Sequence, residues 1–261
     1  MSLDTVPIWI FFVGTIILVM ASIEAGYRLG RVAHRRSEDE KEAPVTGVSG
    51  SVLGLTAFML AFTFGMAAQR YDDRKSLVRD DANAIRTSYQ RADFLPEPDR
   101  LEAKKLLREY LDIRLAFAQA NSIEPQHVKA VRDVTDRIQR RLWVMAVANA
   151  EKDMNSDVAA LYVDSLNNLF EINASRLAVG LQSRIPFGIW FVLYGLTIFG
   201  MMSIGYHAGI VESKRSTSTL ILALSFAMVI VVIASLDRPG GYVRVTQQPL
   251  ADLQSFIASG R

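Results

Sequence analysis

The chain has 261 residues, of which 50% are hydrophobic, and a formal net charge of +2. So small a charge argues against the strongly basic surface that nucleic-acid binding requires, and the absence of cysteine excludes disulfide frameworks and thiol chemistry. The hydrophobic residues gather in four runs without charge, each long enough to cross a bilayer, which takes about 20 residues in a helix. These runs are 5–23, 43–69, 185–211 and 216–236.

We therefore predict an all-α integral membrane protein with four transmembrane helices and a helical extramembrane bundle inserted between spans two and three. The predicted order is span one at 1–29, a short basic loop at 30–48, span two at 49–69, the extramembrane domain at 70–184, span three at 185–211, a short loop at 212–217, span four at 218–236, and a C-terminal tail at 237–261 with a short helix.

Span one begins near Pro7, a residue that suits the first turn of a helix. The segment before it lacks the basic region of a signal peptide, so we predict that this span is retained. Glu24 lies near the end of the span, four residues before Arg28. This spacing favours an ion pair over a proton or ion site, because Glu24 is not at the membrane centre.

Span two carries a stripe of polar residues. Ser49, Thr56, Thr63 and Arg70 recur every seven residues and therefore lie close to one line on a helix. Polar residues in register within a membrane indicate a water-facing surface, so these four are candidates for lining a pore. The alternative is local, because Ser and Thr in membrane helices also bond back to the carbonyl four residues earlier.

A second stripe on the same span consists of small residues, which let a neighbouring helix approach closely. The helix-packing candidates are Gly50, Gly54, Ala57, Ala61 and Gly65. After Arg70 the chain becomes highly charged but contains neither Gly nor Pro until Pro96. We predict one continuous helix over 49–91, on the order of 60 Å long.

The region 70–184 reads as entirely helical, with breaks at 95–99 and 121–125 and a turn near 153–157. Pro186 is expected to bend or restart the helix at the membrane surface, and Pro249 to begin a final helix. Apolar stripes predict that these helices pack as antiparallel hairpins. The stripes are Val78, Ala82, Ile85 and Tyr89; Leu106, Tyr110, Ile113 and Phe117; and Val131, Val134, Ile138, Leu142 and Met145.

Basic residues predict the orientation. The first loop contains Arg31, Arg35, Arg36 and Lys41, whereas the segment before Pro7 contains neither Lys nor Arg. Basic residues in short loops favour the cytoplasm, which predicts the N-terminus outside and the first loop inside. Lys214 and Arg215, between spans three and four, agree with this. Four basic residues next to span two argue for the opposite orientation; they are Arg70, Arg74, Lys75 and Arg79.

Signatures of catalysis are missing from the sequence. His34, His127 and His207 stand in separate segments, without a metal-ligand neighbour at helical spacing. Neither a Gly-rich nucleotide loop nor a Gly-x-Ser-x-Gly elbow occurs. We expect no enzyme activity, no cofactor and no metal site. No acidic residue lies in the middle of a span, which weighs against a proton-coupled transporter.

Several segments resemble the bacterial bestrophin-like proteins of unassigned function. They are 54–75 with 81–85, 106–114, and 236–239 with 248–250, and the span-two segment is the most specific. The resemblance implies kinship with bestrophins, which are pentameric anion channels whose second span lines the pore neck, some bacterial relatives passing cations. It would place the middle domain in the cytoplasm. The calcium-clasp acids and neck motif of bestrophins do not match this chain residue by residue.

Two hypotheses for the function follow. The first is an oligomeric bestrophin-like channel in a bacterial inner membrane. It would pass small ions, anions slightly favoured, through a path lined by span two, with the lipid bilayer and copies of itself as partners. The resemblance implies a pentamer. The alternative is a non-conducting membrane scaffold or signal-relay protein, whose long helices hold a partner.

Overall fold

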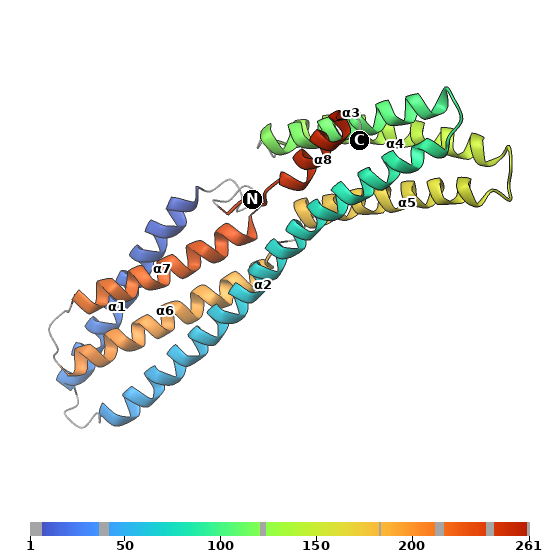
Figure 1. Cartoon of the computed structure of the whole chain (residues 1–261). Helices are drawn as coiled ribbons and strands as arrows, with labels where there is room; N and C mark the ends of the chain where they lie inside the picture. Colours follow the sequence, from blue (N-terminus) through green and yellow to red (C-terminus); the bar gives the residue numbers. More distant parts are fainter. Residues whose placement is uncertain are drawn as a thin grey trace. The chain divides into compact units, whose positions relative to one another are not determined.

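The computed structural model describes residues 7–36, 42–120, 124–182, 184–211, 217–238 and 243–259. Regular structure within these ranges is entirely helical, which confirms the all-α prediction (Figure 1). The chain divides into two units. Unit 1 comprises Met1–Tyr71 and Arg184–Val243, and unit 2 comprises Asp72–Ser183 and Arg244–Arg261.

Unit 1 contains the four helices that are long and apolar enough to cross a membrane. They are α1 (Ile8–Arg36), the first part of α2 (Glu42–Arg91), α6 (Phe187–Ile210) and α7 (Thr217–Asp237). The predicted pair between Glu24 and Arg28 is present, with Arg28 Nε 2.8 Å from Glu24 Oε1. Lys41, Lys214 and Arg215, on which the predicted orientation partly depends, lie outside the described residues.

Helices α1 and α6 approach each other so closely that their backbones touch. Two glycines four residues apart on α1, Gly26 and Gly30, face a similar pair on α6, Gly205 and Gly209. A Cβ atom added to Gly26 would lie 2.0 Å from the carbonyl oxygen of Met202. Only a residue without a side chain fits at such a crossing, which explains this pattern of small residues in membrane helices.

Helix α2 runs without interruption from Glu42 to Arg91, so its continuity over 49–91 is as predicted. The loop predicted at 30–48 is too long, because α1 continues to Arg36 and α2 already begins at Glu42. The part of α2 up to Tyr71 belongs to unit 1 and the part from Asp72 to unit 2. The charged second part has a helical pattern of buried apolar residues, so packing stabilises it where propensity alone would not.

Unit 2 is a helical bundle. After the second part of α2 comes a short 3₁₀ turn, η2 (Ala92–Phe94). Three long helices follow: α3 (Asp99–Ala120), α4 (Pro125–Ala150) and α5 (Asp157–Leu177). A π-helical turn, η3 (Ala178–Gln182), continues α5, and the C-terminal helix α8 (Gln248–Ala258) completes the unit. The hydroxyl of Ser156 caps α5 by accepting from Ala159 N at 3.2 Å. Asp99 is the first residue of α3 and accepts from Asn149 Nδ2 at 2.7 Å.

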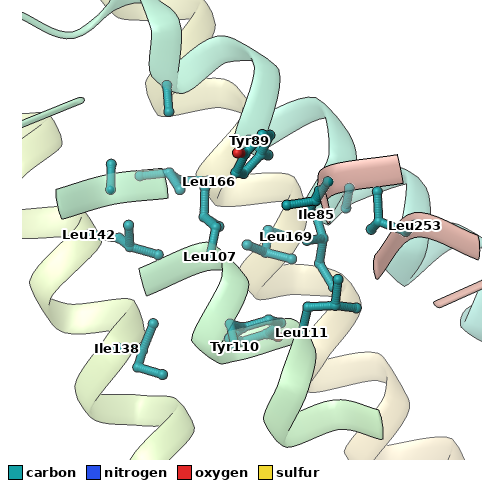
Figure 2. Packing of buried hydrophobic residues seen from close by; sticks show 14 of the residues in the cluster. Ile85, Tyr89, Leu107, Tyr110, Leu111, Ile138, Leu142, Leu166, Leu169 and Leu253 are labelled. Atoms are coloured by element: carbon teal, nitrogen blue, oxygen red, sulfur yellow. The ribbon is translucent and has the colours of Figure 1, made fainter. Parts of the chain in front are cut away.

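One apolar core holds unit 2 together, and side chains from five helices meet in it (Figure 2). The labelled members are Ile85 and Tyr89 from α2, Leu107, Tyr110 and Leu111 from α3, Ile138 and Leu142 from α4, Leu166 and Leu169 from α5, and Leu253 from α8. The predicted α3 stripe is centred one residue off, because Leu106 and Ile113 are only partly buried. The tail helix α8 belongs to this core rather than to a free tail.

Candidate functional site

The first part of α2 has one face that is buried within unit 1, and this face carries the hydroxyl stripe. Thr56 and Thr63 are both 0% exposed. The Thr56 hydroxyl lies 2.7 Å from Val52 O and 3.2 Å from Leu196 O on α6, and the Thr63 hydroxyl donates to Met59 O at 2.7 Å. Backbone carbonyls therefore satisfy these hydroxyl groups, as the local alternative expects.

Ser49, near the start of the same stripe, also faces α6. Its Oγ lies 2.6 Å from Ser203 Oγ, and the side chain is buried. Of the three hydroxyl residues proposed from the sequence as pore lining, Ser49 and Thr56 thus contact α6 of the same protomer, and Thr63 is buried and bonds to its own helix. This placement differs from the expectation that they face water, because a seven-residue repeat identifies a face of the helix without saying what covers it.

Arg70, the fourth candidate, takes part in a polar junction at the end of the apolar segment. Its Nη1 lies 3.5 Å from Oδ1 of Asp237, the last residue of α7. The same carboxylate oxygen accepts from the backbone N–H of Ile185, just before α6, at 3.0 Å. Asp237 therefore ties together α2, α7 and the start of α6. The next residue, Arg238, lies over the ring of Phe11 on α1.

The opposite face of α2 is exposed and carries the small-residue stripe. Gly50, Gly54, Ala57, Ala61 and Gly65 are all exposed. A Cβ atom added to any of the three glycines would meet nothing within 4 Å. Phe58 and Phe62, 63% and 53% exposed, stack on each other beside this stripe. The protomer thus leaves a broad apolar face of α2 without a partner.

No group of three or more His, Asp or Glu residues in the described ranges could hold a metal ion. His127 stacks on Phe117, with ring centroids 5.6 Å apart. Unit 1 is organised by packing between its helices. Within it, the first part of α2 has both a buried face with hydroxyl groups and an open apolar face.

Comparison with known families agrees with this architecture. The Bestrophin-like domain family matches residues 15–250. The chain belongs to the bestrophin-like family. Among solved structures, two variants of a bacterial bestrophin homologue from Klebsiella pneumoniae share 14% identity with it. The match to one variant has a TM-score of 0.65 and covers 97% of this chain and 99% of the variant's chain. The match to the other has a TM-score of 0.60 and covers 92% of this chain and 98% of the variant's chain. At this identity the likeness shows the fold. A search of curated proteins produced no match.

Sequence reasoning missed two features of this bestrophin-like chain. The first is the glycine pairs of α1 and α6, whose four-residue spacing is readable in the sequence as a helix-packing signal. The second is the role of Asp237. No spacing pattern in the sequence predicts this role, although Asp237 lies in a segment that resembles the family. Its partners, Arg70 and Ile185, are distant in the sequence, so only the folded chain brings them together.

Proposed function

We propose that this protein is a homo-oligomeric ion channel. The observation that carries the proposal is the match to the bestrophin-like family over residues 15–250, since bestrophins are ion channels. The four helices able to cross a membrane support it. We propose further that copies of α2 surround the conduction path.

The open face of α2 supports this role better than its hydroxyl stripe does. Within one protomer, Thr56 and Thr63 already donate to backbone carbonyls and are buried. The open space around Gly54 and Gly65 would let equivalent helices of other copies come close. A ring of copies closes such contacts around an axis. Phe58 and Phe62 would then form an apolar constriction of the kind that gates by dewetting.

Small ions are the proposed cargo, with anions slightly favoured, and the basis is kinship with bestrophins. The pairing of Arg70 with Asp237 weakens the argument that a ring of Arg70 side chains attracts anions, since the carboxylate offsets the positive field. We also propose that the channel is a pentamer in a bacterial inner membrane, with the N-terminus outside the cytoplasm. Kinship with bestrophins implies the pentamer, and the basic residues of the first loop favour this orientation.

Planar-bilayer recording of the purified full-length protein tests the proposal. We expect single-channel currents, and a reversal potential in a salt gradient that lies toward that of chloride. A cysteine placed at Phe62, in the proposed constriction, should let a charged thiol reagent reduce the current by about half or more, because it adds a charge in a narrow apolar path. The chain has no native cysteine to react.

Phe191→Cys provides the matched control. Phe191 is as well exposed as the open face of α2 but lies on α6, so the same reagent should leave the current unchanged. Absence of current under varied salts and pH would overturn the channel and favour the non-conducting scaffold. Equal block in both variants would show that α2 does not line the path.

A further inference from the structure

Unit 2 contains a buried cluster of charged side chains from three helices. Asp81 lies on α2, Arg114 on α3 and Arg176 on α5. Arg176 Nη1 donates to Oδ2 of Asp81, and Arg114 Nε lies 3.7 Å from the same oxygen. Two neutral groups complete the cluster: Arg114 Nη2 donates to the Tyr110 hydroxyl at 2.6 Å and to Oδ1 of Asn173.

The cluster holds two positive charges and one negative charge. Guanidinium groups do not lose their proton in proteins, and burial raises the pKa of Tyr110, which keeps this phenol neutral. The side chains of Asp81 and Arg114 are 0% and 7% exposed, so the imbalance lies in the interior. A buried charge without a counter-charge is strongly unfavourable, even after relaxation of the protein.

Hydrogen bonding in the cluster is incomplete for one guanidinium donor and for one carboxylate acceptor. Arg114 Nε is buried and has no acceptor within hydrogen-bond distance. The Tyr110 hydroxyl accepts from Arg114, so its own proton is available to a further acceptor. Oδ1 of Asp81 lacks a donor, a need that one hydrating water would meet. The Arg176 side chain, 17% exposed, gives the cluster an edge toward solvent.

We propose that this cluster binds one small monovalent anion of about the size of chloride, which supplies the second negative charge that Arg114 and Arg176 require. The anion would enter past Arg176 and accept from the guanidinium groups. This site is separate from the open face of α2. The proposal does not depend on ion conduction, because anion binding is read from stability.

Thermal unfolding of the full-length protein in mild detergent tests the proposal. Sodium gluconate, chloride, bromide and nitrate are compared at equal ionic strength. Binding to the folded state alone raises the melting temperature, and we expect a midpoint roughly 2–4 °C higher in chloride or bromide than in gluconate. Equal midpoints in wild-type protein would overturn the proposal, as would a crystal grown in bromide without anomalous density beside Arg114 or Arg176.

Asn173→Asp separates site binding from general salt effects. It places a carboxylate next to Arg114 with almost no change of shape, so the fold should no longer need an anion and the chloride effect should disappear. Asn168→Asp adds the same charge on the exposed side of α5, and this variant should retain the chloride effect. Arg176→Gln, which leaves one charge of each sign, should also lose the effect and serves if Asn173→Asp fails to fold. A chloride effect that persists in Asn173→Asp or Arg176→Gln would contradict the site.

Discussion

Tyr162 illustrates how a single buried polar group affects stability. Its side chain lies in the apolar core of unit 2, and its hydroxyl has no hydrogen-bond partner among the groups that the structure describes. Tyr110, in the same core, accepts from Arg114. Burial without a partner costs free energy, whereas a satisfied group contributes to stability. The two tyrosines should therefore respond differently to loss of the hydroxyl.

We predict that Tyr162→Phe leaves stability at pH 7 unchanged or raises it by up to about 1 kcal/mol, while Tyr110→Phe lowers it by about 1–3 kcal/mol because Arg114 loses an acceptor. Burial raises the pKa of Tyr162 above its ordinary value. The unfolded chain then releases this proton near pH 10 while the folded chain keeps it, so stability falls as the pH rises above about 10.

Melting temperatures between pH 8 and pH 11 measure this effect. Tyr162→Phe should lose less stability over that range than the wild type, since one of the groups that ionise only on unfolding has been removed. An unchanged alkaline slope in Tyr162→Phe would contradict the assignment.

Asp237 is a second residue whose removal should matter, because it serves two partners at once. Asp237→Ala leaves the backbone N–H of Ile185 without its acceptor and Arg70 without its counter-charge. We expect a loss of about 2–4 kcal/mol, seen as a lower melting temperature in detergent. Asp133→Ala, at an exposed position of α4, should change stability by less than about 0.5 kcal/mol. Equal effects of the two variants would show that the junction carries little free energy.

At the scale of elements, the crossing of α1 and α6 rests on the absence of side chains. Gly205 lies where an added Cβ would be 2.0 Å from Ile23 O, while Gly195, on the same helix, has nothing within 4 Å. Gly ordinarily weakens a helix relative to Ala. The close approach of the two backbones therefore explains why Gly is needed at position 205 and is dispensable at position 195.

We predict opposite effects of one substitution at these two positions. Gly205→Ala should force α1 and α6 apart and cost about 1–3 kcal/mol or more. Gly195→Ala should gain about 0.5–1 kcal/mol from the lower backbone entropy of the unfolded chain. Melting temperatures of the two purified variants are compared with the wild type. A stabilising Gly205→Ala would show that the helices are farther apart than described.

At the scale of the whole molecule, the open face of α2 points to assembly. Gly54 has open space around it in one protomer, so a larger side chain fits there without disturbing the fold of that protomer. We predict that Gly54→Leu disrupts the proposed oligomer by blocking close approach of another copy. Native mass spectrometry in mild detergent should then show a shift from the oligomer to smaller species.

Gly14→Leu is the control for this experiment. Gly14, on α1, is equally exposed and has nothing within 4 Å, so the oligomer should survive its replacement. A monodisperse monomer in the wild type would defeat the proposed assembly. An intact oligomer in Gly54→Leu would place the contact elsewhere on the protomer.

The amino-acid sequence by itself determined the elements of this protein. Runs of apolar residues identify four helices able to span a membrane, because length and composition are local properties. The continuity of α2 up to Arg91 could likewise be read from the absence of helix-breaking residues. The turn after Ala150 could be read from a change of apolar register. The resemblance of span two to the family likewise depends only on a contiguous stretch of sequence, residues 54–75.

Only the tertiary structure decided which face of each helix is buried, and by what. Two stripes on span two were equally visible in the sequence, but the hydroxyl stripe is buried, with Ser49 and Thr56 against α6, while the small residues remain open. The partners of Arg70 and Asp81 likewise come from distant parts of the chain. A helical repeat places residues on one side of a cylinder. Whether that side meets protein, lipid or water depends on the neighbouring helices, which the local sequence does not specify.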